Sequence, residues 1–219
     1  MPVHDWKQAD VGLFHHFRQS WIGGLCDVLN TGVLPKGYYA LIDARVSGDL
    51  RTWSFQKSER ESYALRANRI AIRNPGNQPI AVVDLVSPGN KDSSHAIKAF
   101  VEKITEFLAR GVNLLVIDLF PPTPRDPHGI HKVIWDKIHE AAFELPPETP
   151  LVLASYLAAR PRKAYVETVR VGDPLPAMPI FFDRSTYILA PLEETYMRTW
   201  EKCPREMREL VENPPDTAS

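Results

Sequence analysis

The sequence predicts an α/β fold, with a mixed central sheet that carries β-hairpins on one side of a β-α-β crossover. The first observation is the turn sequence N-P-G-N-Q-P, which joins two strand-like segments, 69–73 and 80–86. The second is a stripe of apolar residues at helical spacing over 97–108, closed by Gly111. The third is V-N-L-L-V-I-D-L-F (112–120), an almost continuous apolar run typical of a central strand covered on both faces.

The strand, helix and strand of this central region define one crossover. Such units are right-handed and join parallel strands of the same sheet. We therefore expect 80–86 and 113–119 to be parallel neighbours, linked by a helix near 94–109 that Ser93 or Ser94 caps.

The segment before this unit predicts a helix and two strands. Asp10 caps a helix that ends before Pro35. Its apolar face comprises Leu13, Phe14, Phe17, Trp21, Leu25 and Leu29. The run Y-Y-A-L-I-D-A-R-V (38–46) has the composition of a strand, and Trp53 and Phe55 alternate with polar neighbours as in another strand.

The segment after the unit extends the sheet and closes the fold. The expected elements are a helix near 129–142, strands near 151–157 and 163–170, and helices at 190–202 and 204–211. The proline-rich tract D-P-L-P-A-M-P-I (173–180) is predicted to be extended, because its prolines remove amide donors and restrict φ. We expect Leu175, Met178 and Ile180 of this tract to reach the core.

Length and composition indicate one domain. A chain of 219 residues is long enough to bury a sizeable core. We expect 1–219 to form a single α/β domain, with its core over about 13–185 and a C-terminal helical tail over about 188–211. The 26 Lys and Arg nearly balance the 27 Asp and Glu, so no net field favours nucleic acid or an anionic membrane.

Cysteine usage and hydropathy predict a cytoplasmic protein without a membrane partner. Cys26 and Cys203 lie far apart and match no metal-ligand spacing, as expected for reduced structural thiols. The segment M-P-V-H-D-W-K-Q-A-D lacks the apolar core of a signal peptide. No apolar stretch approaches the length of a membrane span.

One acid, Asp84, stands inside the apolar strand 80–86. Because Val82 and Val86 share its face, we expect Asp84 to be buried. A buried carboxylate must be paired, hydrogen-bonded or bound to a metal, because its desolvation is costly. Two interpretations stay open: Asp84 has a structural partner, either a lysine or the Ser-Pro-Gly-Asn turn at 87–90, or it belongs to a site of chemistry.

The chemical interpretation is a magnesium-dependent nuclease centre. Asp118 ends the parallel neighbouring strand, Lys91 lies just past the end of the Asp84 strand, and Lys98 and Lys103 flank the apolar stripe of the next helix. Asp84 and Asp118 would hold Mg²⁺, and the cation would activate water. Lys91, Lys98 or Lys103 would stabilise the charge that develops on phosphate, and nucleic acid would be the partner.

The histidines do not form a metal-binding pattern. His15 and His16 are adjacent on one helix and therefore point about 100° apart. His128 and His131 share a helical face, but no Cys or acid at ligand spacing completes a site. We expect these histidines to be solvated or hydrogen-bonded within the core, and no metal other than Mg²⁺ is implied.

Three ordered motifs resemble those of a bacterial family. They are V-V-D-L-V-S-P-G-N-K, A-R-G-V-N-L-L-V-I-D-L-F and D-P-L-P-A-M-P-I, and the opening F-H-H-F-R through L-P-K-G-Y-Y-A-L-I-D-A-R-V is similar as well. Over about 13–185 the chain resembles the uncharacterised family called domain of unknown function 4058. The strand-turn-helix-strand core is also similar to the PD-(D/E)XK restriction-endonuclease-like fold, especially its Uma-type branch, in which the helix carries a displaced lysine. That resemblance implies a nuclease-like core.

The chain departs from the family at acidic positions. Asp84 stands where the family motif has Glu, while Ala71 and Val116 stand where the family has acids. Asp43 remains at a position that the family often fills with Glu. A two-acid metal site would therefore combine Asp84 with Asp118 or Asp43. The loss of two acids favours a rival hypothesis, a non-catalytic binding or assembly module on a degenerate nuclease-like scaffold.

Overall fold

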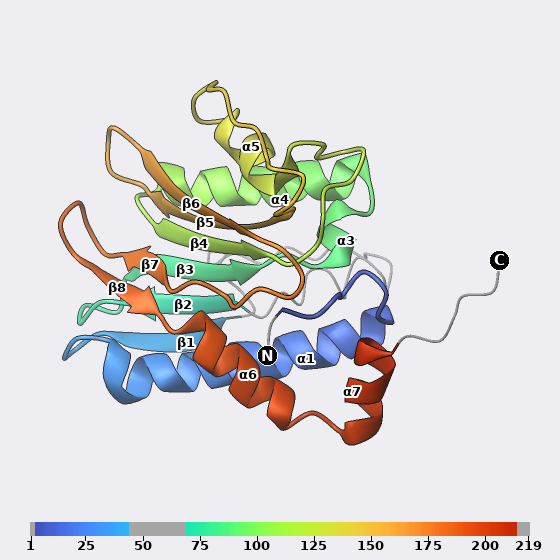
Figure 1. The fold of residues 1–219 in the computed structure, drawn as a ribbon. Coiled ribbons are helices and arrows are strands. Elements are labelled where there is room, and N and C mark those ends of the chain that lie inside the picture. Colours follow the sequence, from blue (N-terminus) through green and yellow to red (C-terminus); the bar gives the residue numbers. More distant parts are fainter. Residues whose placement is uncertain (1–2, 44–68, 214–219) are drawn as a thin grey trace, which may run out of the picture.

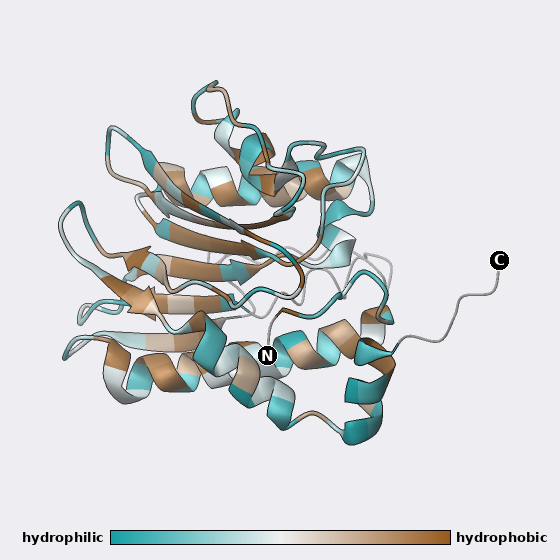
Figure 2. Ribbon diagram, in the orientation of Figure 1, coloured by the Kyte–Doolittle hydropathy of each residue, from teal (hydrophilic) through white to brown (hydrophobic). Residues whose placement is uncertain are grey.

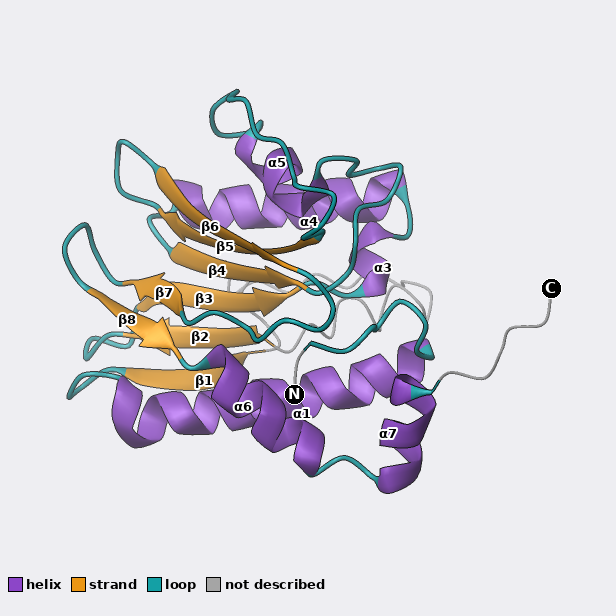
Figure 3. Ribbon diagram, viewed as in Figure 1, coloured by secondary structure: helices purple, strands orange, loops and turns teal. Residues whose placement is uncertain are grey.

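The computed structural model describes residues 3–43 and 69–213, in which a mixed sheet lies between layers of helices (Figures 1 and 3). Six strands of this part lie side by side in chain order. They are β1 (Tyr39–Asp43), β2 (Arg69–Arg73), β3 (Pro79–Leu85), β4 (Asn113–Asp118), β5 (Leu151–Leu157) and β6 (Lys163–Val169). All neighbours are antiparallel except β3 and β4. The predicted α/β class with a mixed sheet is confirmed.

The central crossover has the predicted topology. β3 and β4 are parallel neighbours, with Val83 opposite Leu115. They are linked by the short helix α3 (Pro88–Lys91) and the long helix α4 (Ser94–Ala109). Ser93 caps α4, because its hydroxyl accepts a hydrogen bond from the Ala96 amide at 3.0 Å.

Each face of the sheet carries its own hydrophobic core. On β3, Val83 and Leu85 point into one core, while Val82 and Val86 point into the other. Helices α4 and α5 (Gly129–Trp135) cover the second core. Helices α1 (Val11–Val28) and α6 (Leu192–Glu201) cover the first (Figure 1). The strands between these layers are predominantly brown in Figure 2, as expected for a sheet covered on both faces.

The N-terminal segment is tied to α6 by buried aromatic side chains. The Tyr196 hydroxyl accepts hydrogen bonds from the His4 amide at 3.2 Å and from Trp6 Nε1 at 3.0 Å. The His4 ring stacks on Trp200 at a centroid distance of 3.7 Å. Helix α1 begins after Asp10, whose carboxylate accepts from the Gly12 amide at 2.8 Å, so the predicted cap is confirmed.

The C-terminal part follows the predicted course. The proline-rich tract is extended, and Leu175, Met178 and Ile180 are all buried, as predicted. Its end forms β7 (Met178–Phe181), which pairs with β8 (Tyr187–Ala190) in a separate two-stranded sheet. The chain continues through α6 into α7 (Arg205–Glu212). Both cysteines are free and buried.

One predicted helix is shorter than expected, and one predicted strand lies outside the described residues. The helix predicted near 129–142 begins as expected but ends earlier, at Trp135. The chain then turns back, and Leu145 approaches Gly129, where an added Cβ would lie 3.0 Å from the leucine side chain. Gly129 also has φ +79°, so both the backbone and this close packing favour glycine at the start of α5. The strand predicted around Trp53 and Phe55, like the end of the segment 38–46, lies outside the described residues.

Candidate functional site

The backbone brings the three candidate acids to one edge of the sheet. Strands β1, β3 and β4 run in the same direction, and Asp43, Asp84 and Asp118 lie at or near their carboxyl ends. In the register, Asp43 is opposite Arg69 and Asp84 is opposite Val116. The Asp43 side chain is outside the described part of the structure. The carboxyl ends of the three strands therefore lie at the same edge of the sheet. Whether the acids form one site depends on what the Asp84 and Asp118 side chains contact.

Asp84 is buried between two cationic side chains. It is 1% exposed and points to the α4 face of the sheet. Arg69 Nε donates a hydrogen bond to Asp84 Oδ2, and Lys103 Nζ lies 3.3 Å from the same oxygen. The cations also contact rings of α4, with the Arg69 guanidinium 5.9 Å from the Phe107 centroid and Lys103 Nζ 5.0 Å from that of Phe100. The predicted burial of Asp84 is confirmed, and of the candidate partners only Lys103 contacts it among the described residues, beside the unpredicted Arg69.

A third cation, Arg18 of α1, belongs to the same region. Arg18 is 2% exposed, and its Nε makes no hydrogen bond to any described residue. Burial lowers its pKa, the nearby Asp84 carboxylate raises it, and the Arg69 guanidinium lowers it further. We call Arg18, Arg69, Lys103 and Asp84 the Asp84 cluster. Arg69 and Lys103 contact the Asp84 carboxylate, and Arg18 adds a third positive charge at longer range.

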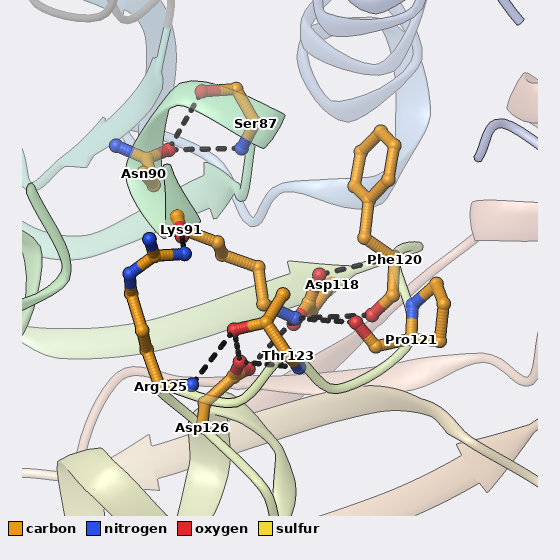
Figure 4. Close-up of polar contacts among 9 residues, drawn as sticks. All are labelled: Ser87, Asn90, Lys91, Asp118, Phe120, Pro121, Thr123, Arg125 and Asp126. Carbon is orange, nitrogen blue, oxygen red and sulfur yellow. Dashed lines mark hydrogen bonds and ion pairs between the residues drawn. The ribbon is translucent and has the colours of Figure 1, made fainter. Parts of the chain in front are cut away.

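Asp118 belongs to a second group of buried charges, centred on Lys91 (Figure 4). Lys91 Nζ lies 2.8 Å from Asp118 Oδ2 and 2.8 Å from Asp126 Oδ2. It also donates to the carbonyls of Phe120 at 3.2 Å and Pro121 at 3.1 Å. All three charged side chains are at most 3% exposed. We call Lys91, Asp118 and Asp126 the Lys91 cluster.

Local hydrogen bonds position Lys91 and Asp126 of the Lys91 cluster. The turn Ser-Pro-Gly-Asn-Lys forms α3, in which the Asn90 side chain accepts from the Ser87 amide and hydroxyl, each at 2.9 Å. Lys91 follows Asn90 directly, and its side chain extends to Asp118 at the end of β4. Asp126 Oδ1 accepts from the Thr123 amide at 2.8 Å and from its hydroxyl at 2.5 Å, which holds the loop after β4 closed.

The charges of the Lys91 cluster shift its pKa values. Burial raises the pKa of Asp118 to about 6, with a smaller contribution from the Asp126 charge, and Lys91 opposes the rise. The two carboxylates raise the pKa of Lys91 and outweigh the effect of its burial. One ammonium therefore serves two carboxylates, and Asp118 takes up a proton more readily than an exposed aspartate.

The predicted site residues divide between these two clusters. Asp84 and Lys103 belong to the first, and Asp118 and Lys91 to the second. Lys98 belongs to neither, because it is 69% exposed on α4 with Glu102 3.9 Å away. Among the residues described, no group of three or more His, Cys, Asp or Glu side chains is placed to hold a metal ion. Asp84 and Asp118 pair with different cations, so the described residues form two ion-pair clusters instead of one cluster of acids.

Three members of the clusters, Arg69, Arg18 and Asp126, were not predicted from the sequence. Arg69 begins the first arm of the predicted hairpin, so its position opposite Asp84 follows from the register of that hairpin. Arg18 occupies an inward position of α1, four residues after Phe14 and three before Trp21. A charged residue on an apolar helical face was therefore a usable signal. Asp126 follows a Thr-Pro-Arg turn, and nothing in its spacing points to Lys91.

Comparison with known proteins gave no assignment: neither the protein-family models nor the curated proteins nor the solved structures include a match to this chain. Within residues 3–43 and 69–213, no helix combines the length and apolar character that crossing a bilayer requires.

Proposed function

We propose that this protein is a non-catalytic binding module that holds a phosphate-bearing ligand at the Asp84 cluster. The observation that carries the proposal is the excess of cations: Arg69 and Lys103 contact the single carboxylate of Asp84, and Arg18 adds a third positive charge at longer range. Buried charge is costly unless it is compensated, so an anion would improve the balance of this cluster and a divalent cation would worsen it.

The chemistry of the cluster suits phosphate. Guanidinium groups present planar donors that match the oxygens of phosphate, and Lys103 supplies a mobile point charge. Lys103 is 28% exposed, whereas Arg69 and Asp84 are 8% and 1% exposed, so the lysine marks the side from which a ligand reaches the cluster.

A nuclease-like scaffold related to domain of unknown function 4058 is part of this proposal. The motif residues of β3, α3 and β4 are contiguous in space and carry Asp84, Lys91 and Asp118, which supports the relationship. Ala71 and Val116, which replace acids of the family motifs, are fully buried and fill core positions. Their apolar packing supports a binding role over hydrolysis.

The test is a titration of the purified protein with sodium phosphate at constant ionic strength, with chloride as the reference anion. We expect phosphate to raise the melting temperature and to bind in calorimetry. Lys103→Gln should weaken binding about tenfold, the loss expected for one charge-assisted hydrogen bond. Asp84→Asn should tighten binding, because it removes the only negative charge described in the cluster.

Lys98→Gln is the matched control, because Lys98 lies on the same helix but is exposed and outside the cluster. Its phosphate affinity should equal that of the wild type. The proposal is wrong if phosphate and chloride act alike, or if Lys98→Gln weakens phosphate binding as much as Lys103→Gln.

Metal-dependent phosphodiester hydrolysis is the second candidate. The arrival of Asp43, Asp84 and Asp118 at the same sheet edge favours it. This hypothesis predicts that Mg²⁺ or Mn²⁺ raises the melting temperature of the wild type and that Asp84→Asn abolishes the rise. It also predicts metal-dependent cleavage in a screen of single- and double-stranded DNA and RNA. Stabilisation by phosphate without any shift by metal would reject hydrolysis and favour the binding module.

A further inference from the structure

A pocket of about 470 Å³ lies at the sheet edge opposite the Asp84 cluster. Its location follows from the register, because β5 is antiparallel to β4 and its last residues pair with the beginning of β4. The lining residues come from the end of α5 and from the turn between β5 and β6, and they are Trp135, Ile138, His139, Arg160, Pro161 and Arg162. Its volume falls within the range of small-molecule sites.

One wall of the pocket is a braced aromatic side chain. The Trp135 ring stacks with His131 at a centroid distance of 5.8 Å and with Tyr156 at 6.2 Å. His131 Nδ1 and the Tyr156 hydroxyl lie 2.9 Å apart and are hydrogen-bonded. Ile138 adds an aliphatic surface to the same pocket. A fixed indole beside an aliphatic side chain suits a flat, apolar group.

The other wall is cationic. Arg160 and Arg162 both line the pocket, and none of the six lining residues is acidic. Arg162 Nε is buried and makes no hydrogen bond to any residue that the structure describes. Arg184, from the turn between β7 and β8, donates to the Arg160 carbonyl and so holds the turn in place. Asp136 follows Trp135 but is engaged by Lys132 at 2.5 Å, so it does not offset these charges.

We propose that this pocket binds a small planar aromatic molecule that carries an anionic group, a phosphate or a carboxylate. The ring would lie against Trp135 and Ile138, and the anion would accept hydrogen bonds from Arg160 and Arg162. The free Arg162 Nε supplies the donor that such a ligand satisfies. The proposal is independent of the Asp84 cluster, because it rests on other residues at the opposite sheet edge.

The test compares four probes by calorimetry: phenyl phosphate, benzoate, benzyl alcohol and inorganic phosphate. Phenyl phosphate or benzoate should bind more tightly than either the ring-only or the anion-only probe. The stronger of the two identifies the anion. Arg162→Gln should weaken its binding about tenfold, whereas Lys163→Gln, a neighbouring exposed cation outside the pocket, should leave it unchanged.

Further variants separate the pocket from the Asp84 cluster and from misfolding. In a Lys103→Gln background, which weakens phosphate binding at the Asp84 cluster, the aromatic probe should still bind the pocket, and Arg162→Gln should not alter binding of inorganic phosphate at the Asp84 cluster. Trp135→Leu should reduce the preference for the aromatic probe over inorganic phosphate, provided that its circular dichroism and melting transition show a folded protein. The proposal is overturned if no aromatic anion binds at millimolar concentration, or if Arg162→Gln and wild type bind it equally.

Discussion

Replacing Lys91 by methionine is expected to lower the free energy of unfolding by about 3–5 kcal/mol at pH 7.5. Methionine keeps the length of the side chain but removes the ammonium that lies 2.8 Å from both Asp118 and Asp126. The two carboxylates, which are 1% and 0% exposed, would then be buried without their cation. Breaking a buried ion pair on one side costs far more than the net contribution of the pair, because the remaining charge is desolvated without compensation.

The dependence of this loss on pH identifies its cause. Without Lys91, the pKa of Asp118 should rise further, because the cation that lowers it is absent. Protonation of Asp118 removes a buried charge, so the difference between wild type and Lys91→Met should shrink as the pH falls from 7.5 toward 5. Urea denaturation at several pH values measures this difference.

Lys98→Met serves as the control for Lys91→Met. Lys98 is exposed on the neighbouring helix α4, and its loss should change the free energy of unfolding by less than about 0.5 kcal/mol. A loss below about 1 kcal/mol for Lys91→Met at pH 7.5 would contradict the ion-pair interpretation. So would a loss of full size that does not vary with pH.

The second large effect is acid lability: the free energy of unfolding should fall by about 2–3 kcal/mol between pH 7.5 and 4.5. Burial lowers the pKa of His4 and of His131 from 6.5 to about 4. Between pH 6.5 and 4 the unfolded chain therefore binds protons that the folded chain does not, and acidification favours unfolding. Asp118 acts in the opposite sense, because its folded pKa of about 6 lies above 3.8, and it offsets part of the loss.

Hydrogen bonding explains why His4 is kept neutral. The Tyr196 hydroxyl already accepts from Trp6 Nε1 and from the His4 amide, so its own hydrogen is directed to His4 Nδ1, 2.9 Å away. We therefore assign the ring proton to Nε2, which faces Glu212 at 3.9 Å. A second proton on Nδ1 would meet the hydroxyl hydrogen and break this contact.

Single substitutions can show how much of the acid lability comes from His4 and how much from His131. His4→Phe retains an aromatic ring against Trp200 and removes the titrating group. His131→Phe does the same beside Trp135 and Tyr156. Each should reduce the difference in unfolding free energy between pH 7.5 and 4.5 by roughly 2–3 kcal/mol, whatever its effect at pH 7.5. His16→Gln, on the exposed side of α1, should leave the difference unchanged, and a pH dependence unaltered in both phenylalanine variants would refute the assignment.

The order and type of most elements were predictable because their signals are local. The Asn-Pro-Gly-Asn turn, the three- and four-residue spacing of α4 and the continuous apolar run of β4 each depend on neighbours within a few positions. The handedness rule then placed β3 beside β4 without further information. Prediction was weakest after Trp135, where α5 stops and the chain returns to bring Leu145 close to Gly129.

The candidate site was only partly predictable. The alternation along β3 correctly placed Asp84 in the interior, and Lys103 lies on the helix that covers this face. The nearest partner, Arg69, is instead set by the register of the hairpin, while the lysine just after the strand turns away to Asp118 and Asp126. Spacing along the chain indicated that Asp84 is buried, and it did not indicate which other charges are buried or how they pair.

The sequence alone therefore established an α/β domain, a buried acid on β3 and a need for positive charge beside it. Only the tertiary structure decided that Asp84 is held by Arg69 and Lys103, that Asp118 shares Lys91 with Asp126, and that Trp135 and Arg162 border one pocket. The physical reason is the range of the interactions. Periodicity and turn preferences act over a few residues, whereas a buried charge must find its partner among side chains that strand register and loop path bring within about 4 Å.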